Sequence, residues 1–331
     1  MFTLKKTRDR DFVILNFSDT HMKKSELGED HVFRGVFERT VTEAIARVKP
    51  DLITISGDIS WSGDDAAHAW LADYFDSFGI PWAPVMGNHD NQCGDEFTNS
   101  IADIFLASKH CLFEKGDPAL GCGNYVIVVE EDGRPATALF MMDTHNSYHY
   151  TDANGEERST WGRLSEEQKV WYAEQNAALA ARGCTDTALI MHIPMFAYHT
   201  AAKAAYRDGI DWANLQYECH TDYPAAWRED FVGCARGVQY EGIGAPDVDD
   251  GVMDMLVDGK TTKHVLVGHD HINNWCIEHR GVKLCFSLKA SPSAYWRPFL
   301  NGGTVLTVAS DGITDIHHEY VDCSDLLDTW T

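Results

Sequence analysis

The chain has 331 residues, 44% hydrophobic and 24% charged, and is therefore long enough to form a large buried core. Its net charge is −24, from 27 basic and 51 acidic residues. This argues against a nucleic-acid partner, because phosphate backbones are bound by clustered Lys and Arg. The sequence contains no run of ~18 apolar residues and no apolar signal-peptide core near its start, so we expect a cytoplasmic protein without a membrane span. The nine cysteines include no CxxC pair, and we expect buried free thiols.

The first third of the chain alternates between short apolar runs and amphipathic segments. Residues 31–48 carry apolar side chains at three- and four-residue spacing, which predicts a helix that Pro50 ends. Because each strand is followed by a helix and then by another strand, we expect parallel pairing with right-handed crossovers. The expected strands are 11–17, 51–56 and 81–86, and the expected helices are 31–48, 64–78 and 96–108.

The rest of the chain mixes parallel and antiparallel signals. Asp132-Gly133 separates two apolar runs, as in a hairpin, and Ser165 with Gln168 forms a capping box that begins a helix. Residues 195–246 are aromatic and weakly periodic, and we interpret them as an irregular insertion over the site. The expected strands here are 123–129, 137–142, 187–191, 264–267, 274–278, 282–287, 305–309 and 313–320, and the expected helices are 165–182 and 247–257.

Five polar motifs each begin where an expected strand ends. In an open α/β sheet, ligands bind at the carboxyl ends of the strands. Carboxylate oxygens and imidazole nitrogens are ligands for divalent metals, and one carboxylate has two oxygens with which to bridge two ions. A glycine before the ligand lets the backbone turn sharply and approach the ions. The motifs are Asp-Thr-His at 19–21, Gly-Asp at 57–58, Gly-Asn-His-Asp at 87–90, Met-His at 191–192 and Gly-His-Asp-His at 268–271.

In order and spacing, these motifs resemble those of the calcineurin-like metallophosphoesterases, whose signature is D-x-H, GD, GNH[DE], a later His and GHxH. The resemblance covers residues 19–271 and implies an α/β fold, a four-layer αββα sandwich of two mixed sheets flanked by helices. We expect a single metallophosphoesterase domain over residues 1–331. The stretches that look like the purple-acid-phosphatase branch of the family include Trp161-Gly162, His192-Ile193-Pro194 and Glu241-Gly242-Ile243.

The resemblance implies two divalent ions, of Mn, Fe or Zn, bridged by Asp58. Two ions bring a charge of +4 and two carboxylates −2, so the site would stay positive enough to attract a phosphate. Purple acid phosphatases have GD-x-x-Tyr, in which the Tyr ligates iron(III) and produces the colour. Trp61 stands at that position here, and because an indole has no lone pair for a metal, we expect a colourless or weakly coloured protein. The implied ligands are Asp19, His21, Asp58 and His271 for one ion and Asp58, Asn88, His192 and His269 for the other.

His89 is then left without a metal beside the site. With a reference pKa of ~6.5 it can donate a proton near neutrality, so we assign it to the leaving group and Asp90 to holding its ring. The implied mechanism is in-line attack on phosphorus by a metal-bridging hydroxide. The expected function is a phosphomonoesterase for a small phosphate ester. A phosphodiesterase of the cyclic-nucleotide or glycerophosphodiester type stays open, because the same metal core serves both, and a catalytically inactive scaffold is a third alternative.

Other residues of the sequence are less specific. Asp-Thr-His at 143–145 repeats the spelling of 19–21, but only the first copy precedes Gly-Asp at the expected spacing, so the second is not expected to ligate a metal. Tyr198 and His199 closely follow the motif at 191–192 and are candidate substrate contacts. Arg297, in a loop bounded by prolines, is another candidate for contact with phosphate.

Overall fold

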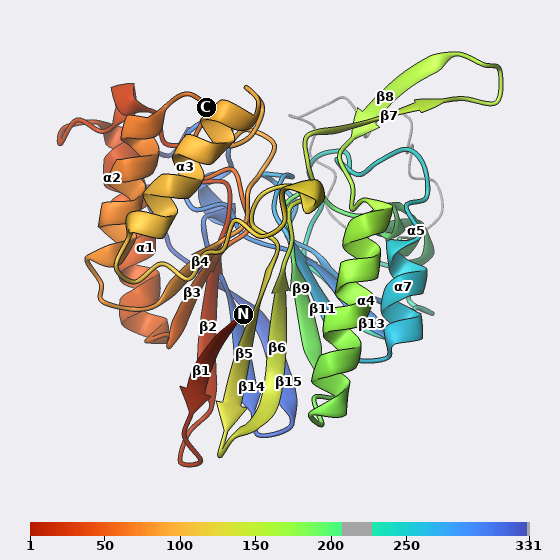
Figure 1. Ribbon diagram of the computed structural model, residues 1–331. Helices are drawn as coiled ribbons and strands as arrows, with labels where there is room; N and C mark the ends of the chain where they lie inside the picture. Colours follow the sequence, from red (N-terminus) through yellow and green to blue (C-terminus); the bar gives the residue numbers. More distant parts are fainter. Residues whose placement is uncertain (207–226, 330–331) are drawn as a thin grey trace.

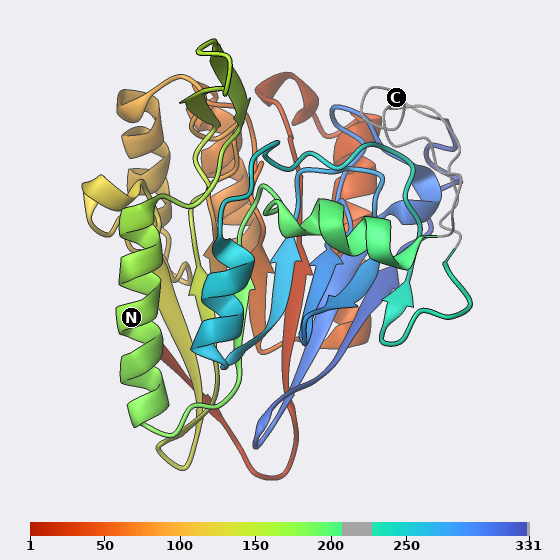
Figure 2. The same cartoon turned by 90° about the vertical axis from the view of Figure 1, so that its right-hand side faces the viewer.

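The computed structural model describes residues 1–206 and 227–329, and it contains two β-sheets packed face to face between two groups of helices (Figure 1). This is the four-layer αββα arrangement predicted from the sequence. The helices beside the smaller sheet are α1 (Val32–Val48), α2 (Asp65–Asp76) and α3 (Asp95–Ala107). Those beside the larger sheet are α4 (Glu166–Ala181), α5 (Ala197–Ala205) and α7 (Val252–Gly259), which Figure 2 shows against its outer face.

The smaller sheet has five strands in the order β15-β14-β2-β3-β4. Its parallel half is β2 (Phe12–Phe17), β3 (Leu52–Ile55) and β4 (Trp82–Pro84), joined through α1 and α2 as predicted. Strands β14 (Gly302–Ala309) and β15 (Gly312–Tyr320) form an antiparallel hairpin beside β2. All four residues of β3 are buried, which is typical of a parallel strand covered on both faces.

The larger sheet has eight strands in the order β1-β5-β6-β9-β11-β13-β12-β10. Its centre is parallel, because β9 pairs with β6 on one side and with β11 on the other. The predicted hairpin is formed by β5 and β6, with Asp132 and Gly133 in its turn. The strands are β1 (Phe2–Lys6), β5 (Tyr125–Glu131), β6 (Arg134–Met141), β9 (Thr187–Ile190), β10 (Ala235–Arg236), β11 (Thr262–Val267), β12 (Cys276–His279) and β13 (Val282–Phe286).

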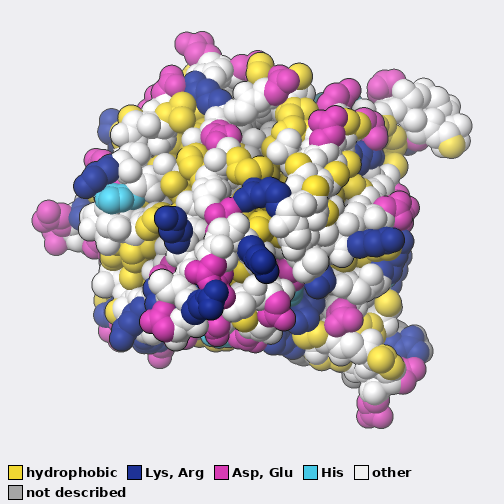
Figure 3. Space-filling model, turned by 60° about the horizontal axis from the view of Figure 1, so that its bottom comes forward, with side chains coloured by type: hydrophobic (Ala, Val, Ile, Leu, Met, Phe, Trp, Pro, Cys, Tyr) yellow, Lys and Arg dark blue, Asp and Glu magenta, His cyan; other side chains and the backbone are white. Residues whose placement is uncertain are grey.

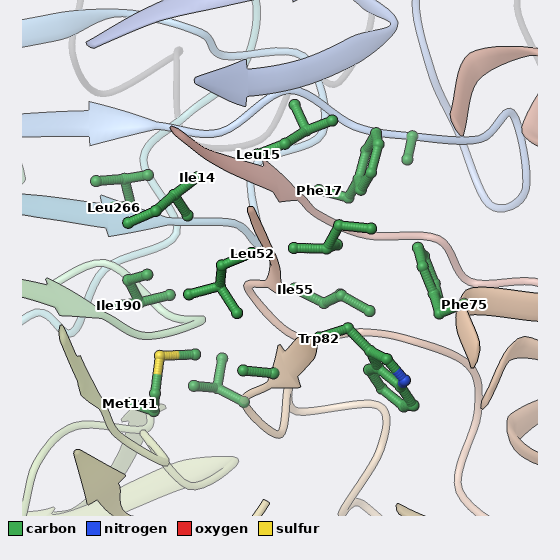
Figure 4. Packing of buried hydrophobic residues seen from close by; sticks show 14 of the residues in the cluster. Ile14, Leu15, Phe17, Leu52, Ile55, Phe75, Trp82, Met141, Ile190 and Leu266 are labelled. Atoms are coloured by element: carbon green, nitrogen blue, oxygen red, sulfur yellow. The ribbon is translucent and has the colours of Figure 1, made fainter. Parts of the chain in front are cut away.

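The main core lies between the two sheets and under the helices of the smaller one. Figure 4 shows Leu52 and Ile55 of β3 among side chains from both sheets, including Ile190 and Leu266. A second cluster lies between the larger sheet and helices α4, α5 and α7. Two apolar clusters fix both faces of the larger sheet, so the ends of its central strands are held in place relative to those of β2 and β3.

Among the described elements, four strands and one α-helix were not predicted, each because its sequence carries little apolar pattern: β1, β7 (Ser147–Thr151), β8 (Glu157–Trp161), β10 and α5. Strand β1 is an exposed edge strand, and α5 buries mainly alanines. The hairpin of β7 and β8 is exposed on both faces and projects from the body of the molecule (Figure 1). Helix α5 corrects the prediction that the segment beginning at residue 195 is irregular, whereas residues 207–226 of that segment lie outside the described part of the chain.

The cysteines differ in part from the prediction of free thiols. Cys276 of β12 and Cys285 of β13 are directly opposed in neighbouring strands, and the structure joins them in a disulfide. Strand pairing brings the two residues together, which spacing in the sequence does not reveal. No described helix is both long and apolar enough to cross a bilayer. The remaining described cysteines are free: Cys93, Cys111, Cys122, Cys184, Cys234 and Cys323.

Candidate metal centre

The five polar motifs converge where strands of the two sheets end. Asp19 follows β2, Asp58 follows β3, His192 follows β9 and His269 follows β11. Hydrogen bonds between the loops hold them together: the Asp19 amide donates to the Gly57 carbonyl at 3.1 Å, and the Gly268 amide donates to the His192 carbonyl at 3.1 Å. Packing of the two sheets therefore brings together motifs that are far apart in the sequence. Asp19, for example, accepts a hydrogen bond from the backbone amide of His269, 250 residues away.

One group of donors consists of Asp19, His21, Asp58 and His271, whose ligand atoms all lie within 4.8 Å of one another. The Nε2 atoms of His21 and His271 are 3.0 Å apart. The Nε2 of His21 is 3.3 Å from Oδ2 of Asp58, and the Nε2 of His271 is 3.4 Å from Oδ1 of Asp19. Two carboxylates and two imidazoles thus surround one point, as the sequence predicted.

A second group consists of Asp58, His192 and His269, again with ligand atoms within 4.8 Å. Asn88 extends it, because its Oδ1 lies 3.1 Å from the Nε2 of His192. The same Nε2 lies 3.1 Å from Oδ2 of Asp58. Asp58 therefore belongs to both groups, and the structure brings together all seven residues expected as ligands.

Hydrogen bonds to backbone carbonyls fix the orientation of two histidine rings in the donor groups. The Nδ1 of His192 lies 2.8 Å from the Ser56 carbonyl, and the Nδ1 of His271 lies 3.0 Å from the Tyr295 carbonyl. Each Nδ1 must carry the proton, since a carbonyl only accepts. In the neutral rings, the Nε2 lone pair of His192 points at Oδ1 of Asn88 at 3.1 Å. The Nε2 lone pair of His271 points at Oδ1 of Asp19 at 3.4 Å. Each contact is repulsive unless a proton or a metal ion lies between the two atoms. The donor set therefore fits two divalent ions that share Asp58.

Electrostatics at the two groups also favour cations. Burial opposes the charge of Asp19 and Asp58, but the neighbouring histidines hold the pKa of each carboxyl well below its usual value. Burial alone would lower the pKa of His192, yet the adjacent Asp58 carboxylate raises it to about 9. Both carboxylates are therefore anionic, and their field attracts positive charge.

The backbone at the ligands is strained in a common way. Asp19, His21, Asp58 and His269 all have positive φ, between 49° and 73°. Such conformations are uncommon for residues other than glycine, and they cluster at functional sites. Each turn redirects the chain at the end of a strand so that the side chain faces the shared point.

The glycines of the motifs make room for this close approach. A Cβ at Gly57 would lie 2.6 Å from the His192 ring. A Cβ at Gly87 would overlap the backbone and carboxylate of Asp58, and one at Gly268 would overlap the Ser18 hydroxyl. Any side chain at these positions would push the ligand loops apart, which is the role predicted for the glycines.

His89 lies beside the two groups, and its backbone amide donates to Oδ1 of Asp58 at 2.8 Å. Its ring packs against Trp61, with 4.2 Å between the ring centres, and its Nδ1 contacts Oε1 of Gln92 at 2.8 Å. Burial lowers the pKa of His89. Because Oε1 of an amide only accepts, Nδ1 carries the proton in the neutral ring and Nε2 is the exchangeable position.

Asp90 does not hold the His89 ring, so that part of the sequence prediction is wrong. Its carboxylate accepts from the backbone amides of Ile59, Ser60 and Gly87 at 2.8 to 3.2 Å and contacts Nε2 of His68 at 3.0 Å. Asp90 thus ties the loop after β3 to the loop after β4. Among the described residues, Gln92 is the one whose side chain hydrogen-bonds to the His89 ring, and no motif in the sequence pointed to it.

The candidate substrate contacts are not at the site. Tyr198 is fully buried, and its hydroxyl donates to the carbonyls of Val265 and Cys285 in the second core cluster. Arg297 is 3% exposed, with its guanidinium 4.2 Å from the centre of the Tyr240 ring. None of Tyr198, His199 and Arg297 lines the cleft over the metal ligands, which corrects their assignment.

The second Asp-Thr-His copy is also separate from the donors, as predicted. Asp143 accepts from the Cys122 amide at 3.0 Å and from the Asn91 side chain at 3.3 Å. His145 contacts Gln168 at 3.0 Å. These residues support the loop after β4 and the start of α4, and they belong to neither group of ligands.

A cleft of about 770 Å³ opens over both donor groups. Its walls include residues to which the sequence assigned no role, although some belong to stretches noted for their resemblance: Trp161, Glu241, Asp247, Asp270 and Tyr295. Trp161 ends the projecting hairpin, and its ring centre is 4.3 Å from that of His269. The cleft is considerably larger than a phosphate group, so it has room for the rest of a phosphoester.

The family model for calcineurin-like phosphoesterases matches residues 12–273, and the chain belongs to that family. Among curated relatives, it is 26% identical over 317 residues to probable inactive purple acid phosphatase 28 of Arabidopsis thaliana, covering 88% of this chain and 73% of that protein. It is also 26% identical to probable inactive purple acid phosphatase 29 of the same plant, covering 74% of this chain and 61% of that protein. A dimetal phosphatase from Danio rerio has a similar fold, with a TM-score of 0.55 and 13% identity over 95% of this chain and 98% of that one.

Proposed function

We propose that this protein is a phosphoester hydrolase dependent on two divalent metal ions, and that it acts as a phosphomonoesterase. The observation that carries the proposal is the pair of donor groups that share Asp58, with the Nε2 atoms of His192 and His271 turned toward oxygen acceptors. Bound Mn, Fe or Zn would be held by Asp19, His21, Asp58 and His271 on one side and by Asp58, Asn88, His192 and His269 on the other. Such ions supply Lewis-acid charge for the phosphoryl oxygens and activate water.

The residues of the chain contribute orientation and proton transfer. Hydrolysis breaks the bond between phosphorus and the alcohol oxygen, adds the oxygen of water to phosphorus and leaves a proton on the alcohol. His89 lines the cleft and would give that proton from Nε2 in the protonated form of its ring, while Gln92 accepts from Nδ1 and holds the ring. Asp90 keeps the loops that carry Asp58 and Asn88 in register.

Several features support a small ester rather than a nucleic acid as substrate. The net charge is −24. On the face of the molecule shown in Figure 3, Lys and Arg lie among Asp and Glu, whereas nucleic-acid binding requires a clustered basic surface. The described residues that line the cleft include no Lys or Arg. The positive charge that attracts a phosphate there would therefore come from the bound metal ions.

An inactive protein of the same fold is the second candidate, because both plant relatives named above carry the words "probable inactive" in their names. Metal analysis of the purified protein, with activity on p-nitrophenyl phosphate and bis-p-nitrophenyl phosphate, separates the possibilities. We expect about two ions per chain and faster hydrolysis of the monoester. Faster hydrolysis of the diester would make the protein a phosphodiesterase, and less than about one ion per chain without activity would favour the inactive alternative.

A further inference from the structure

The walls of the cleft over the donor groups carry acidic side chains but no basic ones among the described residues. Among the described residues that form its walls, Lys and Arg are absent, whereas Glu241, Asp247 and Asp270 contribute carboxyl groups beyond the ligand Asp58. An anionic group elsewhere on the substrate would therefore meet no positive side chain in these walls. A substrate with one phosphate and no further negative charge fits the cleft best.

Two of the three carboxyl groups are already engaged. The oxygens of Glu241 accept from the Ile272 amide at 2.7 Å and from the Tyr295 hydroxyl at 2.5 Å. Those of Asp270 accept from the Gly244 amide at 3.0 Å and from the Asn273 side chain at 2.9 Å. Both side chains are buried and serve to fix the loops around them.

Asp247 differs, because it is exposed on the wall of the cleft and no described residue donates a hydrogen bond to its carboxylate. Its backbone amide donates to the hydroxyl of Thr160 at 2.9 Å, which fixes Asp247 beside the end of the projecting hairpin. His199 lies near Asp247, and because burial lowers the pKa of His199, its imidazole does not offset the negative charge near neutral pH.

Trp161 follows Thr160 directly and lines the same cleft. Trp161 is 42% exposed. Arg163, two residues further along the chain, lies with its guanidinium 3.6 Å from the centre of the Tyr148 ring instead. The Trp161 ring therefore remains open to a cation from outside the described chain.

The wall of one cleft thus carries an exposed indole and a carboxylate that no described residue hydrogen-bonds. Such a pair can recognise an ammonium group through cation–π attraction and charge. We infer that Trp161 and Asp247 form a subsite for a cationic leaving group, so that the substrate is a zwitterionic phosphoester of a primary or quaternary amino alcohol. This inference rests on the proposed function, since the phosphate would lie at the metal ligands of the same cleft. Phosphocholine is the probe of this chemistry, and phosphoethanolamine is its primary-amine counterpart.

The test compares phosphocholine with 3,3-dimethylbutyl phosphate, which has the same shape but a neutral carbon in place of the nitrogen. With the metal-loaded protein we expect roughly tenfold higher kcat/KM for phosphocholine, the size of a partly desolvated cation–π contact. Trp161→Ala and Asp247→Asn should each lower this ratio several-fold. Asp258→Asn is the matched control for charge, because Asp258 is exposed on α7 and does not line the cleft, and it should keep the wild-type ratio.

Failure of the inference and failure of the proposed function would give different results in these assays. If p-nitrophenyl phosphate is hydrolysed but the two esters react alike, the cationic subsite is wrong and the phosphatase assignment stands. A tenfold preference for adenosine monophosphate over phosphocholine would also overturn it, because Trp161 would then accept a planar base. If no ester is hydrolysed, calorimetric binding of the same two probes to the metal-loaded protein decides: preference for phosphocholine supports the subsite, and equal affinity rejects it.

Discussion

The interior of the central strands and their carboxyl ends follow opposite physical rules. In β3, all four residues from Leu52 to Ile55 are buried and apolar, and they pack against side chains of the other sheet. Three residues further on, Asp58 is a buried carboxylate with positive φ that faces two imidazoles. The interior gains stability from burial, whereas the ends concentrate strain and unpaired acceptors that only a cation would relieve.

Asp58→Asn should have the largest effect on activity, because it removes the carboxylate that both donor groups share. We expect kcat/KM to fall by roughly 10³ or more, since metal ions supply several kcal/mol of transition-state stabilisation. The metal content of the variant should fall as well, while the metal-free protein stays folded. Elemental analysis and circular dichroism measure the two properties separately.

Asp143→Asn is the matched control, because Asp143 belongs to the second Asp-Thr-His copy and to neither donor group. It should retain the wild-type metal content. Loss of metal from this variant, with retention in Asp58→Asn, would show that the donor groups have been assigned to the wrong copy.

His89→Ala should lower kcat by roughly 10² on an alkyl phosphate, because general-acid assistance contributes factors of this order. The effect should be smaller on p-nitrophenyl phosphate, whose leaving group departs without a proton. Metal content should not change, because His89 is outside both donor groups. Equal losses on the two esters would show that His89 does not protonate the leaving group.

Leu266→Ala tests the interior of β11, the strand that precedes His269. Leu266 is fully buried between the two sheets (Figure 4), so we expect the free energy of unfolding to fall by about 2–5 kcal/mol. Urea titration of the metal-free protein measures this change. At urea concentrations below the unfolding transition, the variant should keep its metal content. Loss of metal without a lower free energy of unfolding would contradict the view that the strand interior provides stability and the strand ends bind the ions.

A smaller effect concerns two histidines away from the donors. Burial lowers the pKa of His264 to about 3 and that of His318 to about 4. Both are neutral in the folded chain near neutrality, so their contribution is fully present above the unfolded pKa of ~6.5 and is lost as pH falls. Between pH 7 and pH 5, the free energy of unfolding should fall by roughly 1–2 kcal/mol for each of these two histidines. In urea titrations at these two pH values, His264→Leu should lose its share of this dependence.

How much the sequence determined can be judged from particular residues. The five motifs were recognised because each follows an apolar strand, and parallel strands place such ends at one edge of a sheet. The seven expected ligands within and around them came from the resemblance to the family, and the structure brings these seven residues together. The glycines were predicted for the same local reason. These are properties of short segments, which the order of residues alone specifies.

Other features came only from the tertiary structure. Asp90 contacts His68 and three backbone amides rather than the His89 ring, because the loops after β3 and β4 lie side by side. Tyr198 is buried in the second core, since α5 packs on the larger sheet. Trp161 reaches the cleft at the end of a hairpin whose polar sequence carries no core pattern. Local periodicity records what a segment buries, whereas the partner of a side chain depends on which distant segment folds beside it.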